Sequence, residues 1–183
     1  MKVVALVGMA GAGKSEVARL FEQKGYVRIR FGDITDREVE RRGLRLNETN
    51  ERFVRETLRA EHGMAAYAKL SKPDIDRTLE RANVVVDGMY SWEEYLLLKK
   101  YYAETLSVVA VWASPRKRYF RLSVREVRPL TRKEAEQRDK SEIENLNKGG
   151  PIAMADFTII NESTLEDLRK QTEAVLARLN KAL

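Results

Sequence analysis

The chain has 183 residues, of which 43% are hydrophobic and 34% are charged, so it is long enough to bury one core and short for two. No segment approaches the roughly 18 consecutive apolar residues of a membrane-spanning helix, and the absence of cysteine excludes a disulfide framework and a thiolate metal site. The N-terminus carries no recognisable signal peptide. We therefore expect one domain, residues 1–183, in a cytoplasmic protein. Acidic residues are interleaved with the basic ones, so the net charge of +6 favours a solvated surface over a nucleic-acid partner.

Five short apolar runs are separated by helical patterns along the chain. Continuous Val/Ile runs indicate strands that are buried on both faces of a parallel sheet. The alternation of strand and helix predicts a three-layer α/β fold. The predicted strands are Val3–Val7, Val27–Phe31, Val84–Asp87, Val108–Trp112 and Phe157–Ile160.

Several helix boundaries carry capping signals. Ser114-Pro115 fits an N-cap followed by a proline at the first helical position, and glycines stand where helices should end. Residues 116–150 are mostly charged and lack a strand, so we expect them to be helical and mobile. The predicted capping boxes are Ser91–Glu94, Thr131–Glu134 and Ser163–Glu166, and the helix-ending glycines are Gly25, Gly43 and Gly63.

The turn after the first strand fits the spacing G-x-x-x-x-G-K-[ST] of a phosphate-binding loop. Glycines let the backbone N–H groups turn toward a β-phosphate, and the start of the following helix adds partial positive charge. Lys14 would bridge the β- and γ-phosphates, and the Ser15 hydroxyl would ligate Mg²⁺. The loop consists of Gly8, Met9, Ala10, Gly11, Ala12, Gly13, Lys14 and Ser15.

Asp87 ends the third apolar run and is a second candidate Mg²⁺ ligand, although a strand-ending Asp often only forms a turn. A GTPase would need an Asn-Lys-x-Asp base reader after a strand. The segment Asn147–Gly150 lacks that Asp and follows a charged helix. The motif of transporter ATPases is also absent, so the pattern favours a small kinase that uses ATP and Mg²⁺.

The order and spacing of six segments carry a resemblance that covers almost the whole chain. They are "GMAGAGKS" at 8–15, "FGDITDREVERRG" at 31–43, "VVVDG" at 84–88, "SPRKRYFRLSVR" at 114–125, "QRD" at 137–139 and "ADFTIINEST" at 155–164. On these segments the chain resembles the nucleoside monophosphate kinases and dephospho-CoA kinases, and most closely an archaeal-type adenylate-kinase-related family of undefined substrate. The resemblance implies a sheet of order 2-3-1-4-5, a helical acceptor-binding arm at about 32–80 and a helical lid at about 116–150.

The resemblance also implies roles for residues near the donor nucleotide. Arg121 corresponds to an arginine that stacks on the donor adenine, and Arg125 and Arg138 to lid arginines that clamp the phosphates. Arg118, Arg128 and Arg132 are substitutes if the register differs by a turn. Asn161 and Glu162 would frame the base, while Ser163 caps the last helix.

The acceptor side departs from this pattern. Asp33 fits a residue that orders a Mg²⁺-bound water or accepts a proton from an acceptor hydroxyl. The related kinases carry an arginine three residues later, where this chain has Asp36, and a second one after Asp-Gly, where this chain has no arginine. Tyr90 stands where the acceptor would lie. The candidate acceptor residues are Asp36, Arg37, Arg41, Arg55, Arg59, Gly88 and Tyr90.

We therefore expect ATP-dependent phosphoryl transfer to a nucleotide or nucleotide-like small molecule. A second hypothesis is transfer to a hydroxyl acceptor of the dephospho-CoA type, because a bidentate arginine is the natural reader of a phosphate and both expected arginines are missing. A third hypothesis is an ATPase or assembly factor that binds RNA or protein, and a fourth is a nucleotide-binding protein with little turnover.

Overall fold

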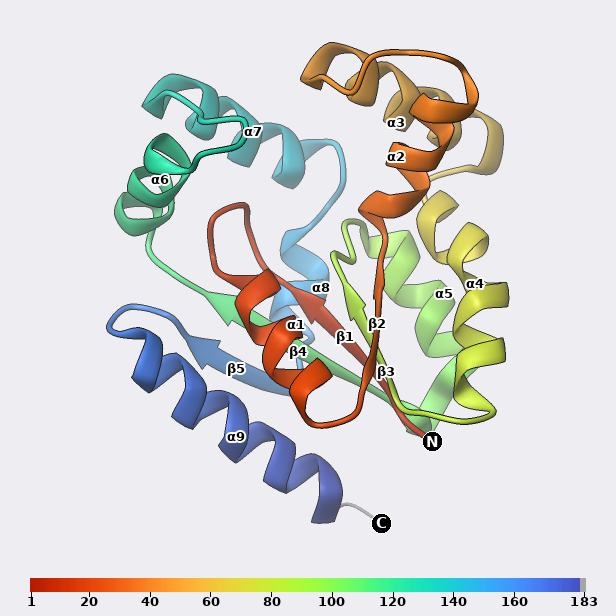
Figure 1. Cartoon of the computed structure of the whole chain (residues 1–183), viewed down its shortest axis with the longest axis vertical. Coiled ribbons are helices and arrows are strands. Elements are labelled where there is room, and N and C mark those ends of the chain that lie inside the picture. The colour runs from red at the N-terminus through yellow and green to blue at the C-terminus, as the bar shows by residue number, and fades with distance from the viewer. Residues whose placement is uncertain (182–183) are drawn as a thin grey trace.

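The computed structural model describes residues 1–181 and contains a five-stranded parallel sheet with helices on both faces (Figure 1). The strand order β2-β3-β1-β4-β5 confirms the predicted topology. The strands are β1 Val3–Val7, β2 Val27–Arg30, β3 Val84–Asp87, β4 Leu106–Trp112 and β5 Phe157–Ile160. The helices are α1 Lys14–Gln23, α2 Gly32–Arg41, α3 Glu48–His62, α4 Ala66–Leu79, α5 Trp92–Tyr102, α6 Pro115–Val124, α7 Arg132–Glu144, α8 Gly149–Ala153 and α9 Leu165–Lys181, with a 3-10 turn η1 at Ala103–Thr105.

The central strand β1 is fully buried, and its side chains enter two separate apolar layers. Val4 and Leu6 pack in the layer that contains α1 and α9. Val3, Ala5 and Val7 pack in the layer that contains α4 and α5. Because both faces of the strand are covered, every position is apolar, which explains the continuous Val/Ile runs.

Three predicted boundaries differ from the structure. β2 ends before Phe31, which has helical backbone angles and precedes α2. β4 begins two residues before the predicted start at Val108, because Leu106 and the polar Ser107 also pair with β1. The third capping box is wrong by one residue. The Asp167 N–H donates to Thr164 Oγ1 at 3.1 Å, whereas the two capping boxes at Ser91 and Thr131 are confirmed.

Two helical segments rise beyond the carboxyl ends of the strands, on opposite sides of the molecule (Figure 1). One consists of α2 and α3, and the other of α6 and α7. In open α/β sheets this edge is where ligands bind. Across residues 1–181, no helix combines the length and the apolar character that crossing a membrane requires.

Candidate active site

The loop between β1 and α1 requires glycine for two reasons. Gly8, Gly11 and Gly13 all have positive φ, at 141°, 78° and 104°. A Cβ atom on Gly8 would also lie 2.2 Å from the carbonyl oxygen of Val111. Only glycine combines this backbone conformation with so close an approach. The loop is thus wrapped tightly at the end of the sheet, directly before the N-terminus of α1.

The amino group of Lys14 is folded over this loop. Its Nζ donates to the carbonyl oxygens of Gly8 at 2.8 Å and Met9 at 3.2 Å. Burial, together with the nearby charge of Lys148, lowers the pKa of Lys14 to about 7, while Glu142 and Asp87 act in the opposite direction. A phosphate group would therefore stabilise the protonated form of Lys14.

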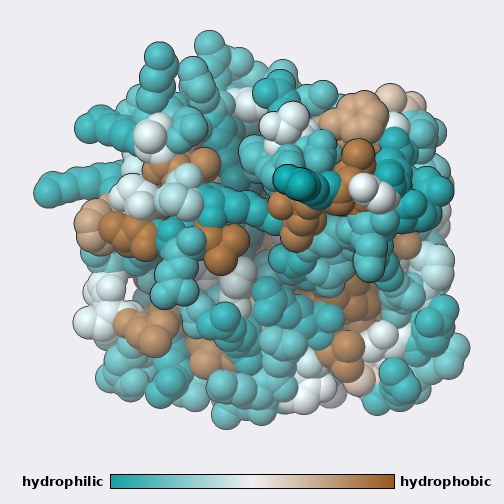
Figure 2. Space-filling model, turned by 45° about the horizontal axis from the view of Figure 1, so that its top comes forward, coloured by the Kyte–Doolittle hydropathy of each residue, from teal (hydrophilic) through white to brown (hydrophobic). Residues whose placement is uncertain are grey.

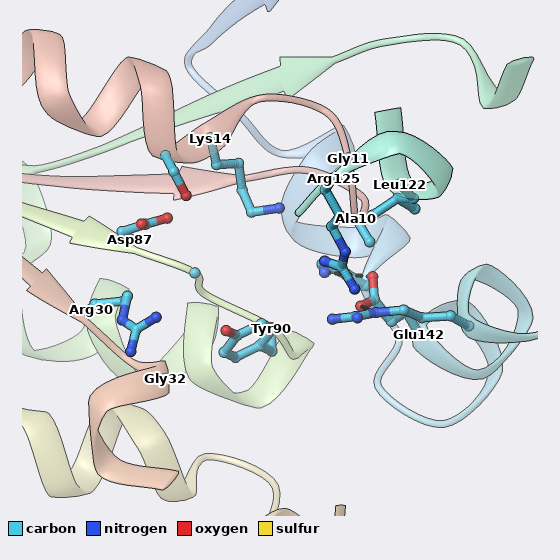
Figure 3. A pocket seen from close by; sticks show the side chains of 14 residues that line it. Ala10, Gly11, Lys14, Arg30, Gly32, Asp87, Tyr90, Leu122, Arg125 and Glu142 are labelled. Atoms are coloured by element: carbon cyan, nitrogen blue, oxygen red, sulfur yellow. Dashed lines mark hydrogen bonds and ion pairs between the residues drawn. The ribbon is translucent and has the colours of Figure 1, made fainter. Parts of the chain in front are cut away.

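A cavity of about 220 Å³ opens between the loop and the two helical segments. Figure 3 shows Lys14 and Arg125 extending toward its centre, with Asp87 and Arg30 on one side and Tyr90 across from the loop. The cavity gathers predicted residues from four parts of the chain: Ala10, Gly11, Lys14, Ser15, Asp87, Gly88, Tyr90, Arg125 and Arg138. It is also lined by Gly32 and Leu122 and by three charged residues that sequence reasoning missed, Arg30, Glu142 and Lys148.

Basic side chains outnumber acidic ones around this cavity. Five lining side chains are lysine or arginine and two are carboxylates, an excess of three basic groups (5 − 2), of which Lys14 is the one whose pKa is lowered to about 7. The basic residues are Lys14, Arg30, Arg125, Arg138 and Lys148, and the carboxylates are Asp87 and Glu142. Such an excess in a small cavity favours a polyanion, so the residues fit the phosphates of a nucleotide. Figure 2 shows that hydrophilic residues also dominate the outer face seen from above the helical segments.

Asp87 is held at the predicted metal side of the cavity. Its side chain is 6% exposed and pairs with Arg28 of the neighbouring strand β2. Arg28 Nε donates to Asp87 Oδ2 at 3.1 Å, and one terminal nitrogen donates to the same oxygen. Ser15 lines the same cavity. A hydroxyl and a carboxylate oxygen are ligands that suit Mg²⁺, so this pair fits the ion.

A buried arginine joins the phosphate-binding loop to α6 and α7. Arg118 donates two hydrogen bonds to Asp139 at 2.9 and 2.6 Å, so the "QRD" segment supplies its partner. It also donates to the carbonyl oxygens of Ala113 and Ala10 at 3.0 and 3.1 Å. Arg118 is 4% exposed. It positions the loop rather than facing the cavity.

The segment after β5 lies against the phosphate-binding loop. Asn161 Nδ2 donates to the carbonyl oxygen of Ala12 at 2.8 Å. Arg121 donates to the Asn161 carbonyl oxygen at 2.9 Å and to its Oδ1 at 3.2 Å. Arg121 and Asn161 are thus neighbours beside the phosphate-binding loop, and their roles at the adenine stay a prediction. Glu162 instead accepts from the Ser114 N–H at 2.5 Å, at the start of α6.

The predicted acceptor residues are dispersed. Asp33 and Asp36 both bind Arg30, whose Nε donates to Asp33 Oδ1 at 2.5 Å. With Arg37 they line a separate groove on α2. Arg41 pairs with Glu38 on the surface, and the guanidinium of Arg59 lies 5.2 Å from the ring centroid of Tyr67. The structure thus places Arg30, rather than any predicted arginine, between α2 and the cavity.

Of the lining residues that sequence reasoning missed, Arg30 had a signal in the sequence and Lys148 had none. Arg30 lies opposite Asp87 in the pairing of β2 with β3, so an alignment of the strand ends could have found it. Lys148 is in a Gly-rich turn and is 1% exposed, and no local sequence pattern predicts a buried lysine at this position.

The loop, the strand order and the cavity define a P-loop protein with a kinase-like fold. The family model described as an AAA domain matches residues 4–147. The chain belongs to the family of UPF0200 proteins: it is 35% identical over 185 residues to a "UPF0200 protein" from Thermococcus gammatolerans, covering 99% of this chain and 97% of the relative.

Two solved structures show the same fold. A gluconokinase from Sinorhizobium meliloti superposes with a TM-score of 0.63 at 19% identity, over 98% of this chain and 94% of the kinase. A shikimate kinase from Bacteroides thetaiotaomicron superposes with a TM-score of 0.59 at 18% identity, over 98% of this chain and 97% of that chain. Both are small-molecule kinases by name, and the likeness concerns the fold.

Proposed function

We propose that this protein is an ATP- and Mg²⁺-dependent phosphotransferase that acts on a nucleotide or nucleotide-like small molecule. The observation that carries the proposal is the convergence of Lys14, Arg125 and Arg138 on one cavity that Tyr90 and Arg30 enter from the opposite side. Phosphoryl transfer spreads negative charge over the equatorial oxygens, and its catalysis consists mainly of positioning and electrostatic stabilisation. Cations from two separate segments suit this task.

Each residue has a defined part in this proposal. Lys14 and the loop N–H groups bind the donor phosphates, and Arg121 with Asn161 contacts the base. Ser15 and Asp87 hold Mg²⁺, which when bound neutralises phosphate charge. The new bond joins an acceptor oxygen to the γ-phosphorus, while the bond from that phosphorus to the bridging oxygen breaks and its electron pair leaves with ADP.

Although the two arginines expected on the acceptor side are absent, Arg30 could bind an acceptor phosphate in their place. It is 46% exposed at its side chain, lines the cavity and carries a bidentate fork. Its pairing with Asp33 and Asp36 also supports a second candidate, transfer to a hydroxyl. There Arg30 stays neutralised, and Asp33, which lines the neighbouring groove but contacts the cavity-lining Arg30, accepts the hydroxyl proton when the acceptor oxygen bonds to phosphorus.

The experiment is a transfer assay with γ-labelled ATP, a panel of nucleoside monophosphates and dephospho-CoA, scored for labelled acceptor and for free phosphate. Label in a monophosphate supports the first candidate, and label in dephospho-CoA together with loss of activity in Asp33→Ala supports the second. Free phosphate alone, stimulated by RNA, would contradict both and favour an ATPase. Lys14→Met is the inactive control.

A further inference from the structure

An ion cluster of two buried residues, Lys148 and Glu142, and the 38% exposed Arg138 connects the end of α7 to the cavity. Lys148 precedes α8, and its Nζ donates to Glu142 Oε2 at 2.6 Å. The other carboxylate oxygen, Oε1, accepts from Arg138 Nε at 3.1 Å. The side chains of Lys148 and Glu142 are 1% and 9% exposed. One carboxylate therefore serves two cations, and all three residues line the cavity.

The cluster lies between the donor side and the acceptor side. Lys148 Nζ is 5.2 Å from the ring centroid of Tyr90, which follows β3. The charge of Lys148 also helps to lower the pKa of Lys14 on the phosphate-binding loop. Figure 3 shows Glu142 next to Arg125, on the side of the cavity away from Asp87 and Arg30. Any anion bound between Lys14 and Tyr90 would thus meet this cluster.

Ionised side chains are a costly way to fill this part of the interior. Taking a lysine and a carboxylate out of water costs free energy that one ion pair repays only in part, so packing alone would be served by apolar side chains. Here a carboxylate instead gathers an ammonium and a guanidinium, the two groups that bind phosphate oxygens in proteins. The resulting arrangement of donors around an anion is one that a phosphate could also occupy.

We propose that Glu142 is a resident counter-ion that holds Lys148 and Arg138 where they bind the γ-phosphate of ATP, and that the γ-phosphate takes over these donors. The inference rests on the proposed donor role of the site. No covalent bond changes in this exchange: the hydrogen bonds of Lys148 and Arg138 move from the carboxylate to the phosphate oxygens. Glu142 is then a positioning residue whose negative charge opposes ATP binding.

The test compares the affinities of the imido analogue of ATP and of ADP, each with Mg²⁺, by calorimetry. Lys148→Met should reduce the preference for the analogue over ADP roughly tenfold, because one charge-assisted contact to the γ-phosphate is lost. Lys148→Arg should retain most of it. Glu142→Gln should raise the ratio of the affinity for the analogue to the affinity for ADP several-fold, since a charge that competes with the γ-phosphate is removed, whereas the effect of Glu142 on Lys14 applies to both nucleotides.

Lys140→Met is the matched control. Lys140 lies on α7, the helix that carries Arg138 and Glu142, is 70% exposed and pairs with Glu144 at 3.9 Å. It should leave the preference unchanged. If Lys148→Met and Glu142→Gln lower the melting temperature but leave the preference at the wild-type value, the cluster is only structural and the inference is overturned. If Lys148→Met does not fold, Glu142→Gln decides alone, because a gain of affinity cannot arise from lost stability.

The two proposals fail separately. A wild-type protein that prefers the analogue but transfers no label to any acceptor contradicts the proposed function and leaves the γ-phosphate assignment standing. Wild-type transfer together with an unchanged preference in Glu142→Gln and Lys148→Met overturns only the role of the cluster.

Discussion

Arg128 and Glu51 form an ion pair that joins the loop between α6 and α7 to helix α3. Arg128 NH1 donates to Glu51 Oε2 at 2.7 Å across 77 positions of the chain. The side chain of Glu51 is 5% exposed, whereas that of Arg128 is 38% exposed. The two helical segments beyond the sheet are therefore connected directly, outside the sheet that carries them both.

We expect Arg128→Ala to free the loop at 125–131. In this variant Glu51 retains its ion pair with Arg55 at 3.5 Å, so the free energy of unfolding should fall by only about 1–2 kcal/mol. Amide hydrogen exchange in the loop and at the start of α3 should accelerate. Arg132→Ala is the control, because Arg132 is 83% exposed and pairs within α7. Equal exchange in both variants would contradict a bridging role.

The pair of Arg118 and Asp139 predicts a larger effect on stability. Arg118→Met would remove both guanidinium donors of the Asp139 carboxylate, which would keep only the Tyr119 hydroxyl at 3.0 Å, and would also remove a donor to the Ala10 carbonyl oxygen. The free energy of unfolding should fall by about 3 kcal/mol, as for other broken buried pairs. Denaturant unfolding measures this loss. The exposed Arg116 on the same helix supplies the control, and Arg116→Met should change stability by well under 1 kcal/mol. A similar loss in both would refute the assignment.

Glu94 predicts a dependence of stability on pH. Burial raises its pKa from 4.5 to about 7, against hydrogen bonds from the Tyr90 and Ser91 N–H groups. Because the folded state holds this proton more tightly than the unfolded state, stability is greatest below pH 4.5 for this group and declines as the pH rises toward 7. The full difference is on the order of 3 kcal/mol.

Glu94→Gln keeps an oxygen acceptor for the N-cap and cannot ionise. The difference in unfolding free energy between wild type and variant, measured from pH 4 to 8, should shift in favour of the variant through this window. A constant difference would show that Glu94 does not bind a proton there.

Arg30 gives a prediction on the acceptor side. Arg30→Gln should raise the KM for a monophosphate acceptor roughly tenfold without changing the affinity for ADP. Asp36→Asn should lower that KM, because it removes one of the two carboxylates that hold Arg30. Steady-state kinetics with the acceptor found in the panel measures both. Arg37→Gln is the control, as Arg37 is 64% exposed and pairs with Asp74. No change in either KM would favour the hydroxyl acceptor.

The strands and the phosphate-binding loop were predictable because their signals are local. A continuous apolar run such as Val3–Val7 predicts a strand that is covered on both faces, and the spacing of the glycines predicts the phosphate-binding loop. The cavity wall was not predictable in the same way. Arg118 looks like any arginine of a charged helix, yet it is buried, and Arg138 lies in the cavity one turn from its partner Glu142.

The arginines predicted for the acceptor side do not line the cavity, for a related reason. Sequence position suggested arginines on α2 and α3, but side-chain direction depends on how these helices pack. Arg30 at the end of β2 binds both Asp33 and Asp36, which lie only three and six residues further along the chain. These contacts cross the junction between β2 and α2, so spacing rules for a single helix do not predict them.

The hydrogen bond from Asn161 to Ala12 makes the phosphate-binding loop depend on the turn after β5. A Cβ atom on Gly13 would lie 2.3 Å from Asn161 Nδ2, and the φ of 104° at Gly13 favours glycine independently of that contact. A smaller residue at position 161 would therefore open space beside Gly13 without making a side chain there acceptable. A chain cut before Asn161 would lose a contact that supports the loop near its own beginning.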